Sequence, residues 1–328
     1  MLKIGITGTG SLVGQAIIKC IRASAYFGKC TIIGFDYLDN TVGSYWVDKN
    51  YRLSDILNRE QNPYHKIVDE VIQIVKTEEI NMLFIGIDFD LPMYAEAKNR
   101  IEEATGTIVV VSSPEVVSIA DDKYKTYKFL KQHGFSCPET YSVDEMPKDL
   151  SFPRILKPAT GASSKGVSIV TSPQEVADRS KNLVNPIIQE LVGDQFSEYT
   201  CGVIMLDDAF IDSIVLRREL KNGDTFRAFY SNDFSSEIYE YIKQVSLALH
   251  PFGVCNFQLR LDKQGVPKIF EINARHSGTT YFRQLFGYNE IEIILNNYFP
   301  VQGYKRPKLI EGTAIRYFEE KLVVKNEA

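Results

Sequence analysis

Residues 270–275, Phe270-Glu271-Ile272-Asn273-Ala274-Arg275, form the most informative segment of the chain. Their alternation predicts a β-strand, on which every second side chain points to the same face. Glu271, Asn273 and Arg275 then share one face, and the three apolar residues form an ordinary core face. A carboxylate, an amide oxygen and a guanidinium in a row suit a hard divalent cation with a phosphate beside it. The alternative is a half-exposed strand whose polar side chains face water.

The strand predicted before it, residues 254–261, also alternates. Its polar face would hold Asn256, Gln258 and Arg260, and its core face would hold Cys255, Phe257 and Leu259. If Leu261 pairs with Val266 across the intervening turn, Gln258 falls opposite Ile269 and diagonal to Glu271. Diagonal neighbours of an antiparallel pair are within side-chain reach. A slip of one residue would move Gln258 to the other face. The sequence therefore predicts a hairpin with an oxygen-rich polar face.

Size and composition exclude several classes of function. The chain has 328 residues, 44% of them hydrophobic, which is enough for a large core and two or three domains. The net charge is −5 and no basic run stands out, so nucleic-acid and membrane-surface binding are not expected. No apolar stretch reaches the length of a membrane span. The first residues lack a signal-peptide pattern and the five cysteines are widely spaced, which favours a cytoplasmic protein with reduced thiols.

Residues 1–112 alternate predicted strands and helices, as expected for a parallel, Rossmann-like α/β domain. A turn with Gly8, Gly10 and Gly14 opens the first helix, and Asp36 ends the second strand. This pattern is similar to a dinucleotide fingerprint, although its glycine spacing departs from the usual one. The alternative is a turn that binds another ligand or only packs. Polar residues of this domain where open α/β sheets place ligands are candidate substrate contacts: Gly10, Ser11, Asp88 and Asp90.

The second half of the chain contains a predicted phosphate-binding loop. A strand ends at Lys157-Pro158, and a small, hydroxyl-bearing loop follows, Ala159-Thr160-Gly161-Ala162-Ser163-Ser164-Lys165-Gly166. Glycines let backbone N–H groups approach oxyanions, and serines can donate as well. A mobile hairpin loop without a ligand is the alternative.

Four motifs in this order resemble the ATP-grasp superfamily, and most closely its carbamoyl-phosphate-synthase-like branch. They are Asp122-Lys123, Lys157-Pro158 with the Gly161–Gly166 loop, Gln189-Glu190 with Glu198, and Gln258 with residues 271–275. The resemblance spans nearly the whole chain. It implies an α/β and α+β fold, with a Rossmann-like parallel-sheet domain (1–112) followed by a two-part ATP-grasp unit with antiparallel sheets (113–185 and 186–328).

The resemblance also implies roles for individual residues. The lysines Lys123 and Lys157 would hold the ATP phosphates, and the loop with Gly161, Ser163, Ser164 and Gly166 would close over them. The hinge beside adenine would be Gln189, Glu190, Leu191 and Val192, and Glu198 would bind the ribose hydroxyls. The ligands of Mg²⁺, or of Mn²⁺ in its place, would be Gln258, Glu271 and Asn273. Arg275 would neutralise the transferring phosphoryl group.

Two further arginines end a predicted strand ahead of a turn. Because adjacent strand residues face opposite ways, at most one of Arg217 and Arg218 should point into the site. Arg218 joins Arg275 and Lys157 as a predicted catalytic residue, while Arg217 and His276 are candidate substrate contacts. A structural role is the alternative for His276.

The implied activity is ATP-dependent ligation of a small carboxylate to an amine or thiol through an acyl phosphate, with release of ADP and phosphate. Three alternatives stay open: phosphorylation of carbonate or carbamate, nucleotide binding without catalysis, and NAD-dependent redox chemistry. Homodimers are common in the family. The sequence does not identify the substrates.

Overall fold

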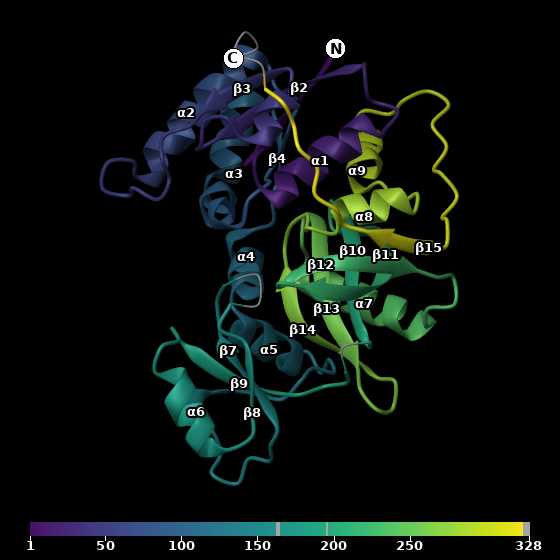
Figure 1. Ribbon diagram of the computed structural model, residues 1–328. Helices are drawn as coiled ribbons and strands as arrows, with labels where there is room; N and C mark the ends of the chain where they lie inside the picture. Colours follow the sequence, from purple (N-terminus) through teal and green to yellow (C-terminus); the bar gives the residue numbers. More distant parts are fainter. Residues whose placement is uncertain (162–164, 195, 324–328) are drawn as a thin grey trace.

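The computed structural model describes residues 1–161, 165–194 and 196–323, and three β-sheets organise it (Figure 1). The first sheet is parallel, and the other two are antiparallel. This confirms the predicted fold class.

The first sheet has five strands in the order β3-β2-β1-β4-β5. Its strands are β1 (Leu2–Thr7), β2 (Cys30–Asp36), β3 (Lys49–Arg52), β4 (Met82–Phe84) and β5 (Ile108–Val110), and its helices are α1 (Leu12–Arg22), α2 (Tyr64–Glu78) and α3 (Leu91–Thr105). Helix α1 packs on one face of the sheet, and α2 and α3 pack on the other. Near-continuous apolar strands follow from this coverage of both faces.

The second sheet is small, with the order β6-β9-β7-β8. Its strands are β6 (Thr140–Ser142), β7 (Arg154–Pro158), β8 (Ser168–Val170) and β9 (Pro186–Glu190), and α6 (Pro173–Ser180) packs on it. Helices α4 (Pro114–Asp121) and α5 (Lys123–Gln132) precede it. The predicted boundary at residue 185 falls too early, because β9 pairs with β6 and β7 and extends this sheet to Glu190.

The third sheet has six strands in the order β14-β13-β10-β11-β12-β15. Its strands are β10 (Glu198–Leu206), β11 (Ala209–Lys221), β12 (Asp224–Tyr230), β13 (Gly253–Leu261), β14 (Pro267–Asn273) and β15 (Gly312–Ile315), and its helices are α7 (Ser236–Leu249), α8 (Thr280–Leu285) and α9 (Glu290–Tyr298). One face packs on α4, α5 and α7. The other shares a core with α8, α9, α1 and the first sheet, which fixes the N-terminal domain against this sheet.

The β13–β14 hairpin differs in register from the prediction. Leu261 pairs with Pro267, and Gln258 lies directly opposite Glu271, with a register shift between Gln258 and Leu259. Leu259 pairs with Ile269, so Phe270 is the extra residue of a β-bulge. The predicted core position of Phe270 is therefore wrong. Its half-buried ring shares a cavity with Glu271.

Candidate active site

Three adjoining cavities meet at β14. The first, of about 160 Å³, lies between the second and third sheets. The second, of about 310 Å³, lies between the third sheet and the N-terminal domain. The third, of about 110 Å³, lies beside α4 and the start of α3. Glu271 lines all three, so β14 forms their common wall.

The two predicted phosphate-binding lysines line the first cavity. Lys157 lies on β7, and its Nζ donates to Gln189 Oε1 at 2.8 Å and lies 5.5 Å from the centre of the Phe270 ring. Lys123, at the start of α5, donates to the carbonyl of Gly161 at 2.9 Å. Burial lowers the pKa of Lys157 to about 7, despite the opposing charge of Glu271. An anion bound beside Lys157 would raise this pKa again, because it favours the charged form of the lysine.

Residues 189–192 form one edge of the same cavity. The Gln189 side chain bridges Lys157 and Thr140. The Glu190 carboxylate accepts from Lys268 Nζ at 3.0 Å, so it is turned toward β14. The Val192 carbonyl accepts from Arg260 at 3.4 Å. This edge therefore presents backbone and apolar surface to the cavity, mainly from Leu191 and Val192.

The structure describes only the two ends of the predicted phosphate-binding loop. Gly161 lines the first and third cavities and has a φ of +118°, which favours glycine. Gly166 has a φ of +74° and packs close to Leu183. Ser163 and Ser164 lie outside the described residues.

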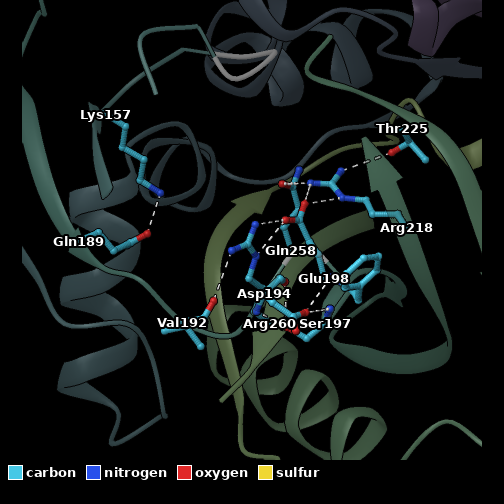
Figure 2. A network of polar contacts seen from close by, with 11 residues as sticks. Lys157, Gln189, Val192, Asp194, Ser197, Glu198, Arg218, Thr225, Gln258 and Arg260 are labelled. Atoms are coloured by element: carbon cyan, nitrogen blue, oxygen red, sulfur yellow. Dashed lines mark hydrogen bonds and ion pairs between the residues drawn. The ribbon is translucent and has the colours of Figure 1, made fainter. Parts of the chain in front are cut away.

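Glu198 on β10 is held between two arginines (Figure 2). Arg218 donates to Glu198 Oε1 through Nε at 3.0 Å and Nη2 at 2.7 Å, and Arg260 donates to Oε2 at the same two distances. Burial alone would raise the pKa of Glu198, but the charges of Arg218 and Arg260 outweigh it and hold the pKa below its ordinary value. Each oxygen already accepts two hydrogen bonds, so the predicted ribose contact would have to displace one of them.

The predicted metal ligands come together on the hairpin. Gln258 and Glu271 are paired across β13 and β14, and Asn273 Nδ2 donates to Glu271 Oε1 at 3.3 Å. The amide oxygens face guanidinium groups, because Gln258 Oε1 accepts from Arg218 at 2.6 Å and Asn273 Oδ1 accepts from Arg275 at 2.9 Å. Within residues 1–161, 165–194 and 196–323, no group of three or more His, Cys, Asp or Glu is placed to hold a metal. The three predicted ligands would bind a metal through oxygen atoms, and only Glu271 among them carries a negative charge.

Arg275 pairs with Asp88 of the N-terminal domain, and both line the second and third cavities. Burial lowers the pKa of Arg275 to about 10, which leaves it charged at neutral pH. Asp90 is buried instead and accepts from the Tyr37 hydroxyl at 2.9 Å. Burial raises the pKa of Asp90 to about 8. Asp88 therefore lines the site, whereas the buried Asp90 lines none of the three cavities, so its prediction as a substrate contact is not supported.

The structure separates the two adjacent arginines of β11. Arg218 lines the first and second cavities. Arg217 faces away, where its guanidinium lies 3.8 Å from the centre of the Phe229 ring and pairs with Glu219. The prediction of Arg217 as a substrate contact is therefore not supported. His276 is buried against Phe84 and Glu290, in agreement with the structural alternative.

The glycine-rich first turn is organised by its own chain. Asp36, which would hold a dinucleotide ribose, accepts instead from Thr9, Thr41 and the backbone N–H of Gly10. A Cβ at Gly14 would lie 2.2 Å from the Gly8 carbonyl oxygen, so this glycine is required for packing. Ser11 caps α1 and lines the second cavity, whereas Gly10 contacts Asp36 and Thr41. These contacts favour the packing alternative over NAD binding.

The sequence reasoning missed three side chains of the cavities. Phe270 lines the first cavity because the β-bulge turns it out of the core. Arg260 pairs with Glu198, and Arg316, which follows β15, lines the second cavity. The alternation of β13 already placed Arg260 on the face of Gln258, and this signal could have identified it. No local pattern marks Arg316.

Comparison with known proteins identifies this arrangement. Residues 120–279 match the ATP-grasp domain family. This stretch, just under half of the chain, is similar to an ATP-grasp domain. The chain is 27% identical over 235 residues to the carbamoyl phosphate synthase large chain of Thermotoga sp. (strain RQ2), an alignment that covers 66% of this chain and 21% of that protein. It is 25% identical over 250 residues to D-alanine–D-alanine ligase of Bacillus anthracis (strain CDC 684 / NRRL 3495), covering 67% of this chain and 79% of that protein.

The fold of most of the chain is similar to that of solved structures. An ADP complex of N5-carboxyaminoimidazole ribonucleotide synthetase superposes with a TM-score of 0.71 at 16% identity, covering 89% of this chain and 76% of that chain. At this identity the likeness concerns the fold alone. The chain spans about a fifth of the length of the carbamoyl phosphate synthase chains it matches. No helix in the described part of this chain is long and apolar enough to cross a membrane.

Proposed function

We propose that this protein is an ATP-dependent ligase that activates a small carboxylate as an acyl phosphate and transfers the acyl group to an amine or thiol. The observation that carries the proposal is the shared wall at β14. Lys123 and Lys157 lie in a cavity on one side of Glu271, and Arg275 lies in a second cavity on the other side. A phosphoryl donor and an acceptor could therefore meet at Glu271 from opposite sides.

ATP fits the first cavity by its chemistry. Leu191 and Val192 would contact adenine, and Lys123 and Lys157 would bind the phosphates. Gln258, Glu271 and Asn273 offer only oxygen ligands, which fits Mg²⁺ provided that phosphate oxygens supply the remaining negative charge. Bound Mg²⁺ would offset the charge that develops during phosphoryl transfer. The relatives named as D-alanine–D-alanine ligase and as an ADP complex support this assignment.

The proposed reaction has two steps. A carboxylate oxygen attacks the γ-phosphorus, the bond from this phosphorus to the bridging oxygen breaks, and ADP leaves with the electron pair. The amine nitrogen then attacks the carbonyl carbon, phosphate leaves with the electrons of the C–O bond, and the nitrogen loses a proton. Arg275 would stabilise the transferring group, and Lys157 would hold the phosphates in line. Arg218 orients Gln258 and Glu198 for both steps.

A panel of carboxylates with ATP, Mg²⁺ and hydroxylamine tests the proposal, because hydroxylamine converts an acyl phosphate into a hydroxamate. We expect ADP, phosphate and hydroxamate in equal amounts, and no product with Glu271→Gln. Glu219→Gln is the matched control, since this glutamate lies in the same sheet and pairs with Arg217 and Arg227 instead. Release of AMP and pyrophosphate would exclude the acyl-phosphate route.

A second candidate is phosphorylation of carbonate or carbamate. The alignment with carbamoyl phosphate synthase large chains favours it, although it covers only 21% of their length. Bicarbonate alone should then stimulate ADP release, and the other carboxylates should have no effect.

A further inference from the structure

Arg316 extends the second cavity beyond the region matched to the ATP-grasp family. It directly follows β15, the edge strand of the third sheet (Figure 1). Its backbone N–H donates to the Phe226 carbonyl at 2.9 Å. Its Nη2 donates to the Gly278 carbonyl at 2.5 Å, and its guanidinium lies 5.1 Å from the centre of the Phe282 ring. These contacts hold the guanidinium in the wall of the cavity that also contains Glu271 and Arg275.

The charge of Arg316 is not neutralised as the other two arginines of this cavity are. Arg218 pairs with Glu198, and Arg275 pairs with Asp88. Among the described residues, no carboxylate lies within 4.0 Å of the Arg316 guanidinium, although Asp224 lines the same cavity and acts on Arg316 from a greater distance. Burial lowers the pKa of Arg316. A half-buried guanidinium without an anionic partner is costly, and a bound anion would remove that cost.

The start of α1 adds partial positive charge to this cavity, whose wall also contains Asp88, Asp224 and Glu271. Ser11, Leu12 and Val13 bring the first turn of α1 to the same cavity. This turn contains no acidic residue, and the N-terminus of a helix carries partial positive charge. A cavity of about 310 Å³ has the size of a small-molecule site.

We infer that the acid activated by this protein carries a second anionic group, a carboxylate or a phosphate, which Arg316 binds while the reacting carboxylate lies at Arg275 and Glu271. The inference rests on the proposed function and makes it more specific. Arg316 is then a specificity-determining residue. It discriminates between acids by the group that does not react, because a planar guanidinium pairs with carboxylate or phosphate through parallel hydrogen bonds.

Matched acids test the inference. Butyrate is compared with succinate, and glycerate with 3-phosphoglycerate, by ADP release with hydroxylamine present and by calorimetric binding with ADP and Mg²⁺ present. In at least one pair, the wild type should favour the member that carries the second anionic group. A preference for succinate would identify that group as a carboxylate, and a preference for 3-phosphoglycerate would identify it as a phosphate. Arg316→Ala should raise KM for that member about 10- to 100-fold, as expected for a charged hydrogen bond, with little change in kcat. Arg316→Lys should recover part of the loss.

Arg227→Ala is the matched control. Arg227 is exposed, lies on the neighbouring strand opposite Ile315 and pairs with Glu219, so its removal should leave both acids unaffected. Arg316→Gln provides a second variant that keeps a hydrogen-bond donor if the alanine variant folds poorly. Equal use of both members of each pair by the wild type, or an unchanged preference in Arg316→Gln, would overturn the inference. So would a wild type that neither binds nor turns over a dianionic acid.

The two proposals fail in different ways. Arg316-dependent binding of a dianionic acid without ADP release would retain this inference and contradict the ligase activity. ADP release with monoanionic acids alone would do the reverse.

Discussion

Arg275, two residues after the end of β14, pairs with Asp88 of the N-terminal domain. The contact joins the end of the strand that carries Glu271 to the segment between β4 and α3. It also orients Arg275, whose Nη2 donates to Asn273 Oδ1 at 2.9 Å. The cation proposed to stabilise the phosphoryl group is thus positioned by residues of two domains.

Removal of Arg275 should reduce turnover far more than nucleotide binding. In Arg275→Ala, kcat should fall about 100- to 1000-fold, because a preorganised charge at the transferring group is lost. Asp88→Asn should have a smaller effect of the same kind, since the guanidinium remains but loses an orienting partner. Steady-state kinetics and ADP titration separate the two quantities. Arg217→Ala, on the opposite face of β11, should behave like the wild type, and an equal loss in that variant would contradict the assignment.

Lys157 should couple nucleotide binding to proton uptake. Its pKa is lowered from 10.5 to about 7 by burial, so above pH 7 the free protein has largely lost this proton. The phosphates favour the charged form, so ATP affinity should fall as the pH rises above 7. Calorimetry in buffers of different ionisation enthalpy counts the protons taken up. In Lys157→Arg the side chain stays charged, and the same uptake in that variant would exclude Lys157 as the source.

The same lysine should affect stability with a defined sign. The unfolded chain holds this proton up to about pH 10.5, and the folded chain releases it near 7. The unfolded state therefore binds more protons within this window, and the free energy of unfolding gains a contribution that rises with pH. Below pH 7 the full cost of the buried charge remains. Urea denaturation of wild type and Lys157→Met between pH 6 and 9 should show the difference shrinking as the pH increases.

Asp90 should show the opposite dependence. Burial raises its pKa from 3.8 to about 8, so the folded protein keeps a proton that the unfolded chain releases above pH 4. Its contribution to stability is full below pH 3.8 and is lost as the pH rises to 8. Asp90→Asn stays neutral and can still accept from Tyr37, so its stability relative to the wild type should increase from pH 5 to 8. A constant difference across this range would show that Asp90 is ionised in the folded protein.

Glu198 should matter for stability as well as for the site. Glu198→Ala leaves Arg218 and Arg260 without their carboxylate, and breaking a buried ion pair in this way costs about 3–5 kcal/mol. Part of this cost is recovered where water reaches Arg260, which is the more exposed arginine. Chemical denaturation measures the change, with Glu219→Ala, at a partly exposed ion pair, as reference. A loss of activity without loss of stability would instead point to a direct contact between Glu198 and the nucleotide.

Local patterns carried much of the prediction. The alternation of residues 254–261 correctly placed Cys255, Phe257 and Leu259 in the core. Ile238, Ile242, Val245 and Leu249 recur at helical spacing, and all four are buried on α7. These features depend on the 2.0 and 3.6 residue periods of the backbone, which a single segment displays by itself.

Sequence alone therefore determined where many of the strands lie along the chain. It also determined the polar face that carries Gln258, Glu271 and Asn273, because both features follow from neighbouring residues. Only the tertiary structure decided which arginine of β11 faces the cavity, and that Phe270 leaves the core at a bulge. It also decided that Asp88 meets Arg275 and that Arg316 lines the second cavity. These relationships depend on strand register and on contacts between segments far apart in the chain, and a local periodicity contains no information about either.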